Sequence, residues 1–120
     1  MSRIALLATG LVAVLAFAAP IGATSSATKL TGTTGPGFTI TLKKAGKMVR
    51  TLKPGKYTIT VSDKSNVHNF RIKGPGLNKQ ITTLSAKGSK TATVTLKKGT
   101  YTYQCDPHAS QGMKHTFRVR

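Results

Sequence analysis

Cysteine is almost absent from this chain of 120 residues, in which Cys105 is the only one. A single thiol excludes an internal disulfide framework. Small domains have a modest core, however, and often need either disulfides or a metal for stability. The absence of disulfides therefore makes a metal site worth searching for.

Glutamate is missing altogether, and Asp63 and Asp106 are the only acidic residues, against 19 Lys and Arg and a net charge of +17. The basic residues are dispersed over turns and polar strand positions. One interpretation is a solvated surface that keeps a small domain soluble, and the other is attraction to acidic partners or to an anionic envelope surface. Nucleic acid is not expected as a partner, because no aromatic residues are interleaved with the lysines as a base-stacking platform requires.

A long apolar run occurs only at the N-terminus, from Ile4 to Ala19, after the basic Arg3 and before a zone of small residues. This is the layout of a secretory signal. We expect residues 1–23 to be removed, with cleavage as late as residue 27. A retained membrane anchor is the alternative, because the run comes close to spanning length. Either way the sequence predicts an exported protein, in the periplasm, outside the cell or associated with the cell envelope.

Helical periodicity is absent from the rest of the chain. Residues 24–37 are rich in Thr, Ser and Gly and predict a tail or linker, so the domain is expected to span residues 38–120. There the apolar residues alternate with threonines, as in half-buried β-strands. The alternating residues are Phe38, Ile40, Leu42, Tyr57, Ile59, Val61, Phe70, Ile72, Ala92, Val94, Leu96, Tyr101, Tyr103, Cys105, Phe117 and Val119. The pattern predicts an all-β fold, a small Greek-key β-sandwich of about seven strands.

The segment CDPHASQGM places a thiolate, an imidazole and a thioether, from Cys105, His108 and Met113, in one loop before the last strand. A second imidazole, His68 in NVHNF, lies at the start of another strand. Two His, one Cys and one Met form the ligand set of a blue-copper site, with three strong ligands and a weak axial sulfur. Each residue alone has an ordinary explanation as a core or hydrogen-bonded side chain. Their joint spacing predicts one copper ion (Cu2+/Cu+) per chain.

These residues resemble those of the cupredoxins, and more narrowly the plastocyanin and pseudoazurin type. YTYQCDPHASQGM is similar to the C-terminal copper loop of that family, and VHNF is similar to its upstream histidine motif. The resemblance implies a blue copper centre in a β-sandwich that carries single electrons between partner proteins. It also implies that His68, Cys105 and His108 are the strong ligands and that Met113 is the axial one.

The resemblance implies supporting roles for Asn69 and Pro107. The backbone N–H of Asn69 is expected to point at the cysteine sulfur, and its side chain is expected to tie the two loops together. Pro107 has no N–H to donate to the sulfur, so we expect a lower potential than a donor at that position would give. The sequence departs from the family at His115, where plastocyanins usually have Gly. We interpret His115 as partly exposed with no metal role; the alternative is that it displaces Met113.

The first functional hypothesis is an electron carrier with acidic redox partners, acting as a monomer. The second is an extracytoplasmic copper chaperone or buffer without redox turnover. A basic sandwich that only binds an anionic wall would leave the ligand cluster unexplained. An enzyme is not expected, because multicopper enzymes need many more histidines and because a metal saturated by protein donors has no open position for substrate.

Overall fold

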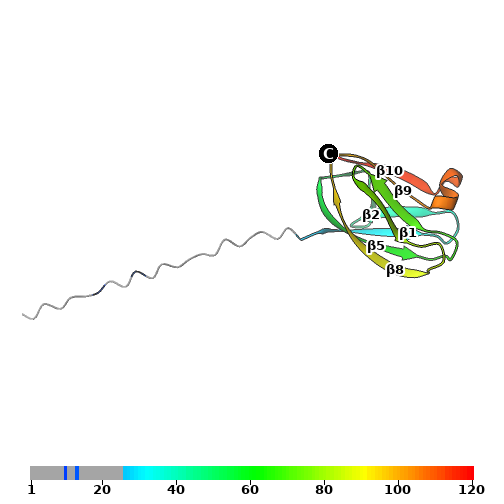
Figure 1. Cartoon of the computed structure of the whole chain (residues 1–120), viewed down its shortest axis with the longest axis horizontal. Coiled ribbons are helices and arrows are strands. Elements are labelled where there is room, and N and C mark those ends of the chain that lie inside the picture. The colour runs from blue at the N-terminus through cyan, green and yellow to red at the C-terminus, as the bar shows by residue number, and fades with distance from the viewer. Residues whose placement is uncertain (1–9, 11–12, 14–25) are drawn as a thin grey trace, which may run out of the picture.

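The computed structural model describes residues 26–120, together with Gly10 and Ala13. Two five-stranded sheets make up the fold (Figure 1). The predicted all-β sandwich is confirmed, with ten strands in the described residues where about seven were expected. The predicted signal segment lies outside the described residues except for Gly10 and Ala13. Within the described part of the chain, no helix is long and apolar enough to cross a membrane.

The first sheet contains, in spatial order, β3 (Lys47–Met48), β2 (Ile40–Lys44), β1 (Thr28–Thr34), β5 (Gly55–Asp63) and β8 (Gly88–Leu96). The second contains β4 (Thr51–Leu52), β10 (Lys114–Val119), β9 (Gly99–Gln104), β6 (Phe70–Gly74) and β7 (Leu77–Thr82). Strand β1 runs parallel to β5 and β10 runs parallel to β4, whereas the other pairs are antiparallel. A short 3-10 helix, η1 (Asp106–Gln111), separates β9 from β10.

Strand β1 corrects the prediction that residues 24–37 form a tail or linker. Residues 28–34 lie between β2 and β5, in register from Thr28 opposite Tyr57 to Thr34 opposite Asp63. The inward positions of β1 are Leu30, Gly32 and Thr34, and only the first is a large apolar residue. Hydrophobic alternation therefore could not reveal this strand, although threonine itself favours β-structure.

Gly32 in β1 lies where the side chains of a facing strand and of a neighbouring strand come close. A Cβ atom at Gly32 would lie 3.0 Å from side-chain atoms of both Phe70 and Val61. The packing therefore admits no larger residue at this inward position without displacing the neighbouring side chains. Gly32 thus interrupts the hydrophobic alternation of β1 and also allows β1 to pack closely against its neighbours.

The core lies between the sheets and follows the predicted alternation. Its aromatic residues stack in pairs, with ring centroids 5.6 Å apart for Phe70 and Tyr103 and 5.5 Å apart for Tyr101 and Phe117. The other buried apolar residues are Leu30, Ile40, Leu42, Val49, Leu52, Tyr57, Ile59, Val61, Ile72, Val94, Leu96, Cys105, Met113 and Val119. Phe38 was wrongly assigned to the inward pattern, because its side chain is 56% exposed.

The sandwich has two distinct ends. At the η1 end, β5 finishes at Asp63, β6 starts and helix η1 lies across the opening (Figure 1). At the basal end, β1 and β5 start and β10 finishes. All the motif residues identified in the sequence, from His68 to Met113, lie at or beside strand termini of the η1 end.

Candidate metal centre

Three of the predicted donors meet at the η1 end. His68 precedes β6, Cys105 follows β9, and His108 lies in η1. One donor atom of each residue can be chosen so that all three lie within 4.8 Å of one another. Cys105 is fully buried and His68 is 2% exposed, while His108 is half-buried. The fold therefore brings His68 close to the loop that holds Cys105 and His108, although they are far apart in the sequence.

The spacing of the three donor atoms fits a metal ion. The Nδ1 atoms of the two histidines are 2.9 Å apart, and the Cys105 sulfur is 3.6 Å from Nδ1 of His68 and 3.5 Å from Nδ1 of His108. A point equidistant from the three corners of this triangle lies about 2 Å from each atom, near the ~2.0–2.3 Å at which nitrogen and sulfur donors bind a divalent metal. The thiolate and imidazole set matches a copper site of the blue type.

The orientation of the histidines leaves one ring edge outside the cluster. Because both Nδ1 atoms face the sulfur, the Nε2 of each ring lies on its opposite side. The rings meet edge to face, with centroids 4.8 Å apart and an interplanar angle of 79°. Since His68 is buried and His108 is half-buried, the outward edge of His108 is the more accessible one.

Backbone hydrogen bonds shape the segment from Cys105 to Met113 into a closed loop. The N–H of Cys105 donates to the carbonyl of Met113, the N–H of His108 to the carbonyl of Cys105, and the N–H of Met113 to the carbonyl of His108. Gly112 ends η1 with φ of 96°, a conformation that glycine adopts without strain. The Met113 side chain is fully buried, and its backbone is bonded to two of the clustered residues.

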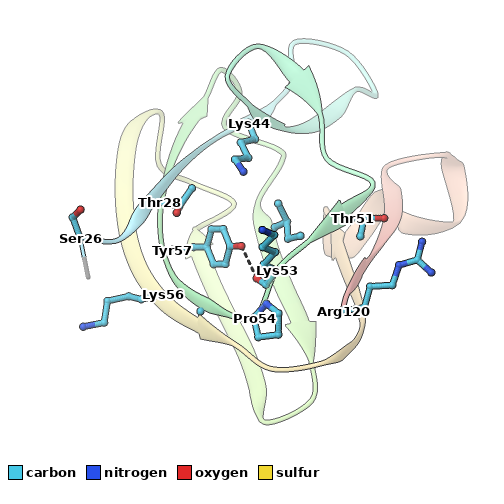
Figure 2. A pocket seen from close by; sticks show the side chains of 11 residues that line it. Ser26, Thr28, Lys44, Thr51, Lys53, Pro54, Lys56, Tyr57 and Arg120 are labelled. Carbon is cyan, nitrogen blue, oxygen red and sulfur yellow. Dashed lines mark hydrogen bonds between the residues drawn. The ribbon is translucent and has the colours of Figure 1, made fainter. Parts of the chain in front are cut away.

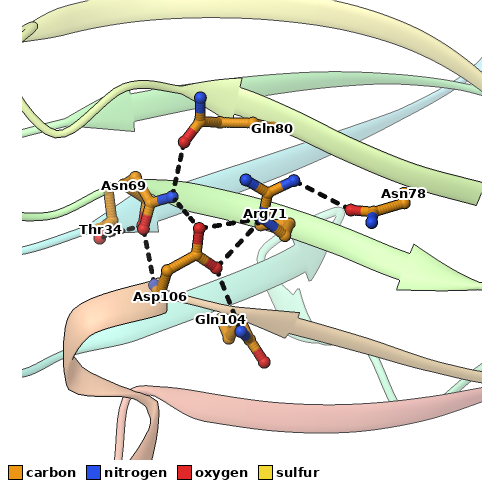
Figure 3. Close-up of polar contacts among 7 residues, drawn as sticks. All are labelled: Thr34, Asn69, Arg71, Asn78, Gln80, Gln104 and Asp106. Carbon is orange, nitrogen blue, oxygen red and sulfur yellow. Dashed lines mark hydrogen bonds and ion pairs between the residues drawn. The ribbon is translucent and has the colours of Figure 1, made fainter.

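The side chain of Asn69 links the His68 strand to the copper-motif loop, as the resemblance implied (Figure 3). Its Oδ1 accepts the backbone N–H of Asp106 at 2.7 Å, and its Nδ2 donates to Asp106 Oδ2 and to Gln80 Oε1, both at 2.8 Å. Asn69 is fully buried whereas Gln80 and Asp106 are exposed, so these bonds are partly shielded from water. The expected bond from its backbone N–H to the cysteine sulfur stays a prediction, as does the effect of Pro107 on the potential.

Asp106 is the acceptor at the centre of this network, which the sequence analysis did not find. Arg71 Nε donates to it at 2.9 and 3.1 Å, and Gln104 Nε2 donates at 3.1 Å. Burial raises the pKa of Asp106, but hydrogen bonds from Asn69, Gln104 and Arg71 and the Arg71 charge together hold that pKa below its usual value. The carboxylate is therefore ionised at neutral pH and holds the start of η1 against β6.

Phe38, which the sequence pattern placed in the core, lies beside the two histidines instead. Its ring centroid lies 4.8 Å from that of His108 and 5.9 Å from that of His68. An exposed aromatic ring thus packs at an angle beside both imidazoles, although it comes from the Gly- and Pro-rich turn between β1 and β2. The sequence signal that could have indicated this position is a large apolar residue within a turn rich in Gly and Pro.

His115 lies outside the three-residue cluster. It is exposed, and its ring centroid is 5.5 Å from that of Tyr103. Among the residues that the structure describes, the group able to hold a metal contains His68, Cys105 and His108 without His115. The exposure of His115 agrees with the interpretation of a partly exposed side chain, and its lack of a metal role stays a prediction.

A buried thiolate and two imidazoles at one end of a β-sandwich define a class of mononuclear copper proteins. The family described as copper binding proteins, plastocyanin/azurin family, matches residues 39–120. The match covers most of the chain, which therefore belongs to the plastocyanin/azurin family of copper-binding proteins. Its cofactor is copper, one ion per chain, and the protein is of the blue-copper electron-carrier type. None of the curated proteins matches the sequence.

Solved structures show the same fold. The copper protein rusticyanin is similar with a TM-score of 0.57 and 20% identity, over 79% of this chain and 80% of that one. A rusticyanin structure from Thiobacillus ferrooxidans gives a TM-score of 0.54 and 24% identity over 79% of each chain. Auracyanin from the photosynthetic bacterium Roseiflexus castenholzii gives 0.55 and 22%, over 80% of this chain and 99% of that one.

Proposed function

We propose that the protein is an exported electron carrier in which His68, Cys105 and His108 would bind one copper ion and Met113 would provide a fourth, weaker sulfur donor. The observation that carries this proposal is the convergence of the three donor atoms within 4.8 Å. Bound copper supplies a one-electron couple. The proposed role is transfer of single electrons between partner proteins, without catalytic turnover of a substrate.

The chain contributes a site that resists rearrangement. The backbone bonds from Cys105 to Met113 fix the loop, and Asn69 and Asp106 join the loop to β6. A geometry that neither oxidation state must greatly change lowers the cost of electron exchange. Burial of Cys105, Met113 and His68 also supports an electron carrier over a chaperone or buffer, because metal exchange requires accessible donors.

We infer that electrons leave through the outward edge of His108. Phe38 lies beside this ring, and Pro107 and Ala109 flank His108 in sequence. These apolar side chains would exclude water when a partner docks, which brings the ring into close contact with the partner. Exposed lysines around the η1 end, such as Lys64 and Lys87, would steer acidic partners by long-range attraction.

Salt dependence of electron exchange tests this proposal. We expect reduction of the oxidised copper protein by anionic ascorbate to slow about tenfold between low and high ionic strength, because salt screens the attraction. Reduction by the cationic hexaammineruthenium(II) complex should instead speed up, since salt screens its repulsion. Stopped-flow bleaching of the visible band gives both rates.

The two reductants are matched controls for each other. If neither reduction rate changes with ionic strength, electrostatic steering by the lysines is contradicted. Failure of either reagent to reduce the copper-loaded protein at any salt concentration would contradict the electron-carrier function itself.

A further inference from the structure

Charge is distributed unequally between the two ends of the sandwich. Both acidic residues of the sequence lie at the η1 end: Asp63 ends β5, and Asp106 begins η1. Within residues 26–120 the observed salt bridge joins Asp106 to Arg71, also at that end. The basal end consequently carries basic side chains and no carboxylate side chain.

An open depression of about 770 Å³ occupies the basal end (Figure 2). Four basic residues line it: Lys44 from the end of β2, Lys53 before β5, Lys56 in β5, and Arg120 after β10. In the view of Figure 2, Lys44 lies above the Tyr57 ring and Lys53 to its right, while Lys56 and Arg120 extend outward from the rim. We call these four residues the basal cluster.

The basal cluster offers positive charge and little else for recognition. The hydroxyl of Tyr57 donates to the backbone carbonyl of Lys53, so it is already committed within the protein. The Tyr57 ring is only 5% exposed and cannot stack on a nucleobase. Lys97 and Lys98, in the turn after β8, add charge at the same end, since Leu96 pairs with Gly55.

Within residues 26–120, three of the four exposed large apolar residues lie at the opposite end. The fourth, Met48 in β3, pairs with Lys43 and does not line the depression. Phe38 lies beside the histidines, Val67 precedes His68, and Leu84 follows β7, whose last residue pairs with Phe70. Protein interfaces depend on apolar anchors at their centre, so the η1 end suits a protein partner. The basal cluster has no apolar anchor residue. Binding to a broad anionic surface does not require one, because charge attraction is enough.

The chain also enters the fold at the basal end. Ser26 and Thr28 line the depression, and the apolar run from Ile4 to Ala19 is separated from Ser26 by six residues. Six residues span at most about 20 Å when fully extended. In the alternative form that keeps the apolar run as a membrane anchor, the membrane is therefore close to the basal cluster.

We propose that the basal cluster docks the domain on an anionic phospholipid bilayer, with the η1 end turned toward the aqueous side. Each basic residue near such a surface strengthens binding about fivefold, and the attraction fades within a Debye length. This orientation leaves His108 and Phe38 free for a redox partner. The proposal concerns residues distant from the candidate metal centre and does not depend on copper binding.

Vesicle flotation tests the proposal. Residues 26–120 hold both sheets and the whole described core, so this segment is a self-contained folding unit. We expect it to float with vesicles of phosphatidylcholine and phosphatidylglycerol at low salt, but not with phosphatidylcholine alone. The triple variant Lys44→Gln, Lys53→Gln, Lys56→Gln should lower the partition coefficient at least about tenfold.

The matched control neutralises three exposed lysines toward the η1 end, Lys64, Lys87 and Lys90, to glutamine, which changes the net charge equally. This control should change the partition coefficient less than about twofold, because those lysines face away from the bilayer. Equal losses in the two variants would show that net charge alone drives binding and would overturn the proposal. Absence of binding to the anionic vesicles at low salt would also overturn it.

Lysine acetylation of the vesicle-bound parent protein gives an independent test of orientation. Mass spectrometry should find Lys44, Lys53 and Lys56 protected by the bilayer, with Lys64 and Lys87 as reactive as in free protein. Protection of the η1-end lysines instead would overturn the proposed orientation. These measurements do not involve copper. Membrane docking can therefore be disproved while the electron-carrier function is retained, and the electron-carrier function can be disproved while membrane docking is retained.

Discussion

Replacement of Cys105 with serine is expected to abolish the intense visible colour of the copper protein. The colour of a blue-copper site arises from charge transfer between a thiolate and copper(II), and Cys105 is the only thiol in the chain. Serine is nearly the same size, so the fully buried position should keep its packing. We expect copper affinity to fall by more than the roughly 10–100-fold that loss of an outer supporting partner costs.

Visible absorption after copper(II) addition, with circular dichroism as a folding check, measures this outcome. The matched control is His115→Gln, which removes an exposed imidazole two residues beyond Met113 and should leave the band unchanged. A coloured, folded Cys105→Ser protein would contradict a thiolate ligand. Loss of colour in His115→Gln would show that His115 takes part in binding.

Replacement of Asn69 with alanine is expected to have the largest effect on stability among the polar residues of the network. The change removes three hydrogen bonds of a fully buried side chain and leaves the Asp106 N–H without its acceptor. A loss of about 2–3 kcal/mol follows from the unpaired groups. For a domain of this size, Tm should fall by about 10 °C or more.

Thermal unfolding of the copper-free protein isolates this effect from metal binding. The matched control is Asn78→Ala, because Asn78 is exposed and accepts a single bond from Arg71. The control should stay within about 0.5 kcal/mol of the parent. Equal Tm values for the two alanine variants would contradict the role of Asn69 as the link between β6 and η1.

Much of the fold could be predicted from the sequence because two physical signals were strong. Alternation of residues such as Ile59 and Val61 marked strands whose inner faces are buried. The donor types of Cys105, His108 and Met113 at short spacing predicted a copper site before any geometry was known. Both signals are local, since they depend on neighbours within a few residues along the chain.

Features that depend on contacts across the fold could not be predicted. Strand β1 was mistaken for a linker, because Gly32 and Thr34 occupy inward positions that usually hold large apolar residues. Phe38 was assigned to the core, because alternation cannot distinguish the last residue of a turn from the first of a strand. The network around Asp106 joins residues up to 37 positions apart, and no spacing rule indicates it.

The structure separates the molecule into two ends with different chemistry. The η1 end combines the clustered donors with exposed apolar residues such as Phe38 and Val67. The basal end combines positive charge with the entry point of the chain at Ser26. The lysines behind the net charge of +17 therefore have different roles in these proposals: those at the η1 end attract a redox partner, and those at the basal end attract a bilayer.

X-ray absorption at the copper edge of the loaded protein identifies the copper ligands directly. We expect one sulfur donor and two nitrogen donors at about 2.0–2.3 Å from a single copper ion. Those donors are Cys105, His68 and His108, with the Met113 sulfur at a longer distance. A spectrum with nitrogen and oxygen donors alone, and no short copper–sulfur distance, would contradict this expectation.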